Sequence, residues 1–378
     1  MKKAIIFLKL FLFSKWVFTK PKPKKFLLVD GVTNPFLKIY KKSDFNILFR
    51  RGESLNFYIL FKCLLNFKIS TLDYFKFYIE ASKPKLILTA YDYNPTFYKL
   101  SKLTGVKTLM LQKAKRIKSH GIIKNEKKIF GLKSKKNNFV DFIFLFNNNV
   151  AKFYKKKISG KYFISGSFPN NFSRINFKNQ KKEILFISNF KADPKDKNKL
   201  DSLCENDDIV INHLGKLAYK NKIKFNILTK RLGPDLKREI EYYKKILNNN
   251  FKIISNDKYP DSYKELVKYR YIFTSYSTLG IENLAKGGRT GFVLLKPTSS
   301  QAYQERFGSF EGLPKKGPFW TNMTILNIIE IERVFNFVIK SNQSTWSKLC
   351  SRYISEVLNY DYNNLKFRKV VEKELSIK

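Results

Sequence analysis

Short apolar runs that alternate with amphipathic stretches of helical length constrain the fold of this chain more than any other feature. The alternation begins at residues 26–30 and continues to residues 291–295, after which a long loop is expected at residues 296–319. Strands separated by helices of this length are typical of βαβ units, whose strands are parallel and covered on both faces. At 378 residues the chain exceeds what one hydrophobic core usually holds. We therefore predict an α/β protein with two Rossmann-like parallel-sheet domains that face a cleft.

The sequence divides into four segments. Residues 25–170 are predicted to form the first Rossmann-like domain and residues 183–340 the second, and residues 341–378 are expected to be helical. Residues 1–24 are apolar and basic, with Trp16 close to several lysines. We expect this segment either to lie as a helix in a membrane interface or to pack as a first helix on the core.

The charge balance of the chain is strongly basic, with 74 Lys and Arg against 30 Asp and Glu and a net charge of +44. Such a balance favours a polyanionic partner, although an AT-rich coding sequence also enriches lysine and would leave it as surface filler. No zinc-finger spacing, RNA-binding run or basic heptad pattern is present, so we do not expect nucleic acid as a partner. An anionic membrane surface requires only charge near that surface, and it is the partner that this composition favours.

Cysteine and histidine usage excludes several kinds of site. The cysteines Cys63, Cys204 and Cys350 are far apart and form no CxxC pair, which predicts neither a disulfide framework nor a zinc site and favours a reducing cytoplasm. The histidines, His120 and His213, belong to no metal-ligand cluster, so no metal is expected. Nucleotide hydrolysis and NAD chemistry are disfavoured because the phosphate-loop and dinucleotide-binding glycine patterns are missing.

The stretch at residues 275–288 predicts a tight turn that opens a short helix between two strands. Ser277 or Thr278 can cap that helix, and Gly287 and Gly288 can end it, where a left-handed residue is easiest to accommodate. The free N–H groups and the dipole at such a helix start favour a bound phosphate. An ordinary capped helix in a βαβ unit fits the same residues equally well.

Charged residues follow several of the predicted strands. Asp30, Glu53 and Asp92 stand at strand ends in the first domain, and Lys230 and Arg231 end a strand in the second. Ligands of open parallel sheets bind beyond the carboxyl ends of the strands, which makes these side chains candidates for a site. Each acid can instead serve as a helix cap or turn residue, and the basic pair as solvated surface charge.

A family resemblance rests on several short motifs taken in order. They are Val29-Asp-Gly-Val-Thr-Asn-Pro-Phe36, Arg51-Gly-Glu53, Leu88-Thr-Ala-Tyr-Asp-Tyr-Asn94, Val140-Asp141, Ile164-Ser-Gly-Ser-Phe-Pro-Asn-Asn171 and Ser277-Thr-Leu-Gly-Ile-Glu282. With them the chain resembles the surface carbohydrate biosynthesis proteins, a bacterial family related to GT-B glycosyltransferases. One departure is the turn at residues 112–116, Gln-Lys-Ala-Lys-Arg, where the family pattern is Gln-Asn-Gly-x-Arg.

The resemblance implies a GT-B-like fold whose second domain binds a nucleotide-sugar donor as substrate, with no permanently bound cofactor. Phosphate binding would fall to Ser277, Thr278, Leu279 and Gly280, ribose binding to Glu282, and charge compensation of the leaving group to Lys230 and Arg231. The enzyme would be a glycosyltransferase of surface polysaccharide biosynthesis, cytoplasmic and associated with the inner face of the inner membrane.

The acceptor implied by the resemblance is a glycan or a lipid-linked glycan held near Asp30, Glu53 and Asp92. Glycosyl transfer needs a base for the acceptor hydroxyl, or substrate-assisted departure, and we expect Asp92 first and Asp30 second as that base. Two alternatives remain open: a nucleotide-sugar 2-epimerase, and a non-catalytic sugar-nucleotide binding module of a polysaccharide assembly complex. The altered turn at residues 112–116 is the reason for keeping the module.

Overall fold

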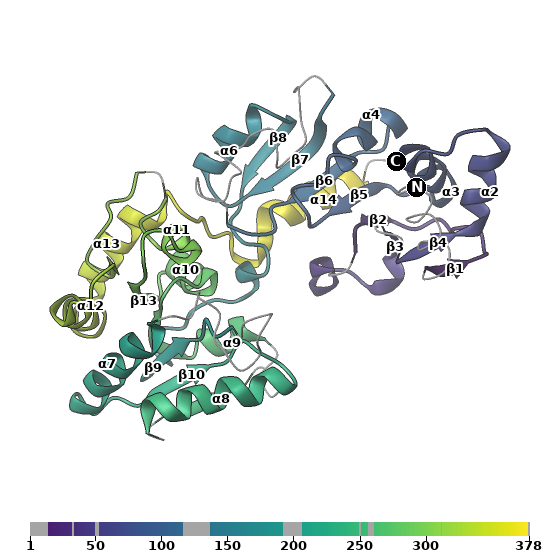
Figure 1. The fold of residues 1–378 in the computed structure, drawn as a ribbon. Coiled ribbons are helices and arrows are strands. Elements are labelled where there is room, and N and C mark those ends of the chain that lie inside the picture. Colours follow the sequence, from purple (N-terminus) through teal and green to yellow (C-terminus); the bar gives the residue numbers. More distant parts are fainter. Residues whose placement is uncertain are drawn as a thin grey trace. The chain divides into compact units, whose positions relative to one another are not determined.

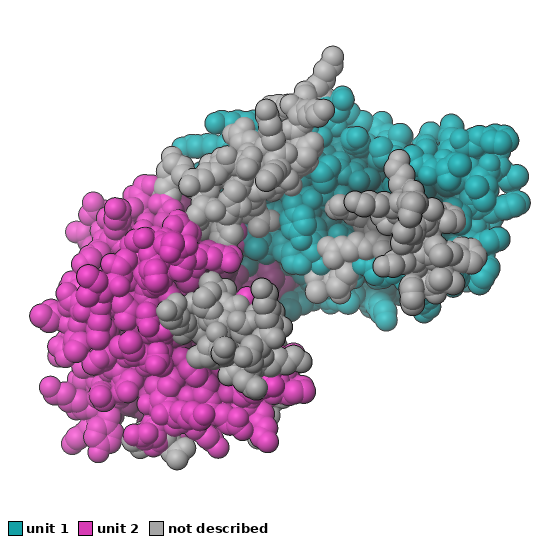
Figure 2. All heavy atoms as spheres, in the orientation of Figure 1, with its two compact units in different colours: residues 1–114, 125–168, 364–378 teal, residues 115–124, 169–363 magenta. Residues whose placement is uncertain are grey.

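The computed structural model contains two compact units (Figure 2). Unit 1 comprises residues 1–114, 125–168 and 364–378, and unit 2 comprises residues 115–124 and 169–363. The structure describes residues 14–31, 34–49, 53–115, 137–191, 206–248, 251–255, 261–310 and 312–376.

Unit 1 is built on a six-stranded parallel sheet with strand order β3-β2-β5-β6-β7-β8 (Figure 1). Its strands are β2 (Phe26–Val29), β3 (Phe45–Leu48), β5 (Leu86–Thr89), β6 (Thr108–Leu111), β7 (Phe139–Leu145) and β8 (Ser159–Ile164). Every residue of β2, β5 and β6 is buried. Continuous apolar runs of this kind become strands because both faces of a parallel sheet are covered.

The helices of unit 1 connect and cover these strands. They are η1 (Pro35–Lys38), η2 (Lys42–Asp44), α2 (Phe57–Leu65), α3 (Thr71–Ser82), η3 (Phe97–Lys99), α4 (Leu100–Thr104), α6 (Asn148–Lys155) and α14 (Leu365–Ser376). Side chains at several helix starts accept hydrogen bonds from the first free N–H groups; Ser70 and Asp73 form a reciprocal capping box at α3.

The last helix of the chain, α14, completes the core of unit 1. The ring of Phe367 is buried. Its centroid lies 5.6 Å from the ring centroid of Phe36, 5.6 Å from that of Phe144 and 5.0 Å from that of Phe168. Near the end of the helix, Glu374 accepts a 2.6 Å hydrogen bond from Lys107. Residues from both ends of the sequence therefore share one hydrophobic core.

Unit 2 repeats the architecture, with strand order β11-β10-β9-β12-β13-β14 and parallel pairing throughout. Its strands are β9 (Lys181–Ile187), β10 (Phe225–Leu228), β11 (Lys252–Ile254), β12 (Tyr269–Thr274), β13 (Arg289–Leu295) and β14 (Trp320–Met323). Its helices are η5 (Asn170–Phe172), α7 (Asp207–Lys220), α8 (Pro234–Leu247), α9 (Ser262–Leu266), α10 (Thr278–Ala285), α11 (Gln301–Glu305), α12 (Ile328–Lys340), α13 (Gln343–Ile354) and η7 (Tyr362–Asn364). The two parallel sheets confirm the predicted α/β class.

Three segments differ from the sequence-based expectation. Trp16, expected on a helix, lies in strand β1 (Lys15–Val17), which pairs in parallel with β4 (Ser54–Asn56); residues 1–13 lie outside the described part of the chain. The expected loop at 296–319 contains α11, capped by Ser300. Strand β14 was not predicted because Trp-Thr-Asn-Met lacks an aliphatic run, yet its pairing with β13 buries every residue.

No helix in the described ranges combines the length and the apolar character needed to cross a membrane.

Candidate functional site

The turn before α10 adopts the capped geometry that the sequence predicts. Ser277 is the N-cap residue, and its hydroxyl accepts a 3.3 Å hydrogen bond from the N–H of Leu279. The N–H of Ser277 donates in turn to the hydroxyl of Thr274, at 3.3 Å. These bonds fix the first turn of the helix, whose positive dipole end is a favourable place for an anion.

Gly280 allows the first turn of α10 to sit close to the sheet, and Gly287 ends the helix. A Cβ atom at Gly280 would lie 2.8 Å from the Thr274 methyl group and 3.2 Å from the ring of Phe292. Gly287 follows the helix with a φ of +83°, which confirms the predicted left-handed end. The start of α10 is thereby held at the carboxyl edge of β12 and β13.

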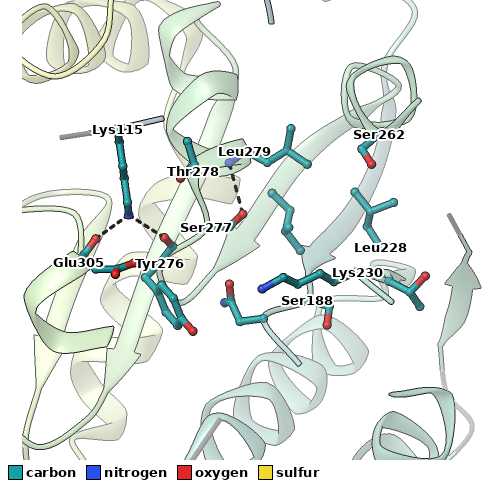
Figure 3. Close-up of a pocket in the computed structure, with 13 residues that line it drawn as sticks. Lys115, Ser188, Leu228, Lys230, Ser262, Tyr276, Ser277, Thr278, Leu279 and Glu305 are labelled. Carbon is teal, nitrogen blue, oxygen red and sulfur yellow. Dashed lines mark hydrogen bonds between the residues drawn. The ribbon is translucent and has the colours of Figure 1, made fainter. Parts of the chain in front are cut away.

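A pocket of about 310 Å³ opens at this edge of the unit 2 sheet (Figure 3). Its walls come from the ends of β9 (residues 187–189) and β10 (residues 228–230), from the turn at residues 276–279, and from Lys115, Ser262 and Glu305. Strand ends and a helix start thus converge where open parallel sheets commonly bind ligands. Ser277, Thr278 and Leu279 line the pocket, and their predicted binding of a phosphate stays a prediction.

Lys115 places an ammonium group at the wall of this pocket. Its Nζ donates to the main-chain oxygens of Glu305 and Tyr276, at 2.9 and 3.3 Å (Figure 3). Burial lowers the pKa of Lys115 to about 8, against a smaller opposing effect of the Glu305 carboxylate. The group therefore stays mostly charged at pH 7 and can meet a phosphate. The sequence analysis noted the turn at 112–116 but not this lysine, and Arg116 lies outside the described residues.

A buried carboxylate holds the loop that carries Lys230 and Arg231. The N–H groups of both residues donate to Glu239, at 2.9 and 2.8 Å, and the hydroxyl of Ser188 also donates to it. Lys230 lines the pocket, as Figure 3 shows. Arg231 instead directs its Nε to the carbonyl oxygen of Phe190, at 3.0 Å. The structure thus brings one of the two predicted basic residues to the pocket wall.

Glu282 lies in α10, but the wall of the pocket does not include it. Its side chain is buried and accepts a 3.2 Å hydrogen bond from Tyr263. One turn later, Lys286 donates a 2.9 Å hydrogen bond to Ser173, and burial lowers its pKa to about 8 despite the charge of Glu282. The predicted role of Glu282 in binding a ribose therefore stays a prediction.

Asp92 is built into the interior of unit 1. It is fully buried, and its carboxylate accepts hydrogen bonds from the hydroxyl of Tyr154 and, at 3.3 Å, from the N–H of Lys113. The hydroxyl of Tyr98 donates to the main-chain oxygen of Asp92, at 2.8 Å. These bonds tie together the segments around three strands, which is the work of a structural carboxylate.

Asp30 stands at the carboxyl end of β2 with a different environment. It is buried, its φ of 64° is left-handed, and its Oδ1 has no hydrogen-bond partner within the described ranges. A strained residue with an unsatisfied buried oxygen is typical of functional sites. Glu53, by contrast, is exposed and immediately precedes β4, so it does not stand at a strand's carboxyl end as expected.

A buried ion pair supports the segment just before the α10 turn. Asp207, the first residue of α7, lies 3.2 Å from Lys296 and accepts a 3.1 Å hydrogen bond from Ser275. Burial raises the pKa of Asp207 to about 6, while Lys296 and Ser275 act in the opposite direction. Sequence reasoning missed this pair because its two residues are distant along the chain.

The part of the chain that the structure describes contains no group of three or more His, Cys, Asp or Glu that could hold a metal ion. Cys63 and Cys350 are buried and free, and His213 is partly buried in α7. Cys204 and His120 lie outside the described residues.

Structural comparison finds solved structures that are similar to this chain over most of its length. MurG of Acinetobacter baumannii matches with a TM-score of 0.50 and 10% identity, over 93% of this chain and 100% of that one. Anabaena Alr3699/HepE, in complex with UDP and glucose, matches with a TM-score of 0.49 and 12% identity, over 94% and 100%. UDP-GlcNAc 2-epimerase from Neisseria meningitidis, bound to UDP-GlcNAc, matches with a TM-score of 0.49 and 12% identity, over 92% and 99%.

Two further matched structures contain longer chains. The protein covers 61% of the matched chain of a GtfA/B complex, at 9% identity and a TM-score of 0.42, with 81% of its own length. It covers 58% of TarM, at 13% identity and a TM-score of 0.38, again with 81% of its own length. A comparison with curated protein sequences finds no match.

Sequence comparison is decisive at the family level. Residues 119–375 match the model of a family described as "putative O-antigen biosynthesis protein". This match spans more than half of the chain, and the two six-stranded parallel sheets correspond to the GT-B architecture seen in MurG. The chain therefore belongs to this family of O-antigen biosynthesis proteins and has a GT-B fold.

Proposed function

We propose that this protein is a glycosyltransferase that moves a sugar from a nucleotide-activated donor to a surface polysaccharide or its lipid-linked precursor. The observation that carries the proposal is the pocket at the start of α10. It combines a capped helix start with the ammonium groups of Lys115 and Lys230. Membership of the O-antigen biosynthesis family supports the same chemistry.

The donor diphosphate would be bound in unit 2 by the turn at residues 276–279. Its negative charge grows as the bond to the sugar breaks, and fixed positive groups are most effective where charge develops. Lys115, already held by two carbonyl oxygens, and Lys230 supply that charge. Glu282 is proposed to bind the ribose hydroxyl groups, and this assignment can be tested separately from phosphate binding.

The acceptor hydroxyl would lose its proton to Asp30. The oxygen then attacks the anomeric carbon, the bond from that carbon to the phosphate oxygen breaks, and the nucleoside diphosphate leaves with the electron pair. Asp30 replaces Asp92 as our first choice because both carboxylate oxygens of Asp92 are engaged within unit 1. Asp30 retains an oxygen without a partner in the described part of the chain.

The test is thermal unfolding of the full chain with UDP, CMP, CDP, GDP and TDP, followed by turnover assays with sugar derivatives of the nucleotide that stabilises it. A ligand that binds only the folded state raises the melting temperature. We expect one nucleotide to do so and its sugar derivative to be consumed only when a glycan acceptor is present.

Other outcomes of this assay would contradict the proposal. Isotope exchange into the donor sugar without an acceptor would indicate an epimerase. Nucleotide binding without any turnover would indicate a binding module, and no stabilisation by any nucleotide would remove the donor site itself.

A further inference from the structure

An exposed apolar surface surrounds helix α2 of unit 1. Its members are large apolar side chains that face solvent, from the end of β1, from α2 and from the turn after it. They are Phe18, Phe57, Phe61, Leu64, Leu65, Phe67 and Ile69, here called the α2 surface. Phe18 is 68% exposed, Leu65 64% and Phe67 92%. Scattered apolar residues are ordinary on a protein surface, whereas a contiguous group marks an interaction site.

Ring contacts join Phe18, Phe57 and Phe61 of this surface into a contiguous group. The ring of Phe57 lies 5.5 Å from that of Phe18 and 6.5 Å from that of Phe61, on which it stacks. Leu64 and Leu65 follow at helical spacing from these residues, so they lie on the same face of α2.

The opposite face of α2 is already used by the core. Ile59 and Cys63 are buried there against Phe77 and Ala81 of α3. The helix is therefore apolar on both sides, although the described residues cover only one of them. A helix that is apolar all round normally belongs in a core or a membrane.

Phe67, in the turn after α2, has an unfavourable backbone conformation. Its φ of 55° is left-handed, where glycine is favoured and a bulky side chain is a genuine outlier. The turn holds Phe67 in this conformation, since the N–H of Phe67 donates a 3.0 Å hydrogen bond to the carbonyl oxygen of Leu64. A glycine would relieve this strain, so the exposed ring itself is the feature that needs an explanation.

The charges around the α2 surface point to an anionic partner. Residues 14–25 contain no acid and residues 53–70 contain only Glu53, while the same ranges carry several lysines. The neighbouring helix α3 adds Glu80, which pairs with Lys62 at 3.5 Å, and the lysines still outnumber the acids. Lys20 places its Nζ 6.0 Å from the ring centre of Tyr58, at the border of the surface. Lysine stems lie along apolar surface while their charges reach anionic headgroups.

We propose that the α2 surface docks into the headgroup region of an anionic lipid bilayer. Aromatic and leucine side chains would enter the acyl boundary, and the lysines would contact lipid phosphates. A second copy of this chain is disfavoured as occupant because a two-fold contact would bring the same lysines together. The inference does not depend on sugar transfer, since lipid binding is measured without donor or acceptor.

The test is sedimentation of the full chain with vesicles of phosphatidylcholine alone or mixed with phosphatidylglycerol. We expect strong binding only to the anionic vesicles. A triple variant, Phe61→Ser with Leu65→Ser and Phe67→Ser, should bind them at least about tenfold more weakly, because each lost side chain removes buried apolar area. Its melting temperature should not fall, since these side chains are exposed.

A matched control uses Ile325 and Ile329, two exposed isoleucines of unit 2 that are 82% and 76% exposed. Changing both to serine should leave vesicle binding unchanged. Undiminished binding by the triple variant, an equal loss in the isoleucine control, or equal wild-type binding to neutral vesicles would each overturn the proposal. So would a dimer that the triple variant converts to monomer while vesicle binding persists.

Discussion

The Nζ atom of Lys115 lies 2.9 Å from the main-chain oxygen of Glu305, and this bond fixes a positive charge at the wall of the α10 pocket. Replacing that charge should weaken donor binding. Lys115→Met is expected to reduce nucleoside diphosphate affinity about 10- to 100-fold, the usual effect of losing a hydrogen bond to a charged group. Titration calorimetry measures it, with Lys220→Met on the exposed end of α7 as control; an equal loss in both variants would contradict the assignment.

The pocket should also bind phosphate less well in mild alkali. The pKa of Lys115 is about 8, so its charge is present at pH 7 and is lost as the pH rises through 8. Affinity should therefore fall between pH 7 and 9 in the wild-type protein. Lys115→Arg keeps its charge throughout this range and should flatten the profile. A fall that persists in the arginine variant would assign the titration elsewhere, with Lys286 as the next candidate because its pKa is also about 8.

Removing one partner of the buried pair Asp207–Lys296 should lower the free energy of unfolding more than removing both. Lys296→Met leaves a carboxylate buried without its partner and should lower the free energy of unfolding by about 3 to 5 kcal/mol. The double variant Asp207→Leu with Lys296→Met should recover most of that loss. Urea unfolding of the four proteins measures the coupling; additive losses would show that the pair is not coupled.

The single variant Lys296→Met should also change the pH dependence of stability. Without the lysine, burial raises the pKa of Asp207 further above its unfolded value, so the folded state binds the extra proton. Its stability should therefore be highest in acid and fall as the pH rises from about 4 towards 7. Thermal unfolding across this range provides the check, and a profile parallel to that of the wild-type protein would contradict it.

Asp30 and Asp92 should respond differently to the same change. Asp30→Asn is expected to abolish sugar transfer while leaving nucleotide binding intact, whereas Asp92→Asn should lower the melting temperature because it disturbs the bonds to Tyr154 and Lys113. Asp30→Gly should be inactive yet slightly more stable, because glycine accepts the left-handed backbone without strain. Full activity in the Asp30 variants would exclude it as the base.

The sequence predicted most of the fold because the strands of both sheets are short and apolar. Runs such as Phe26–Val29 and Leu86–Thr89 are buried on both faces, and such runs are recognisable without knowledge of their neighbours. β14 contains Thr321 and Asn322, so it is a strand only because β13 lies beside it. The capped turn at Ser277 was also predictable, because capping depends on residues that are close in sequence.

The site residues that sequence reasoning missed or placed differently depend on distant contacts. Lys115 binds carbonyl oxygens 161 and 190 residues away, and no local pattern contains that information. The hydroxyl that donates a hydrogen bond to the Asp92 carboxylate comes from Tyr154, 62 residues further along the chain. A carboxylate after a strand looks the same in the sequence whether its partner is a tyrosine or a substrate.

The return of α14 to unit 1 has a consequence for how this protein can be made. The ring of Phe367 fills space between Phe36, Phe144 and Phe168, so a fragment that stops at residue 168 would expose those rings to water. During synthesis the ribosome must finish the whole of unit 2 before the earlier half can close its interior. Expression trials should therefore keep the carboxyl terminus whole, and a nested deletion that removes α14 should leave the amino-terminal half aggregated.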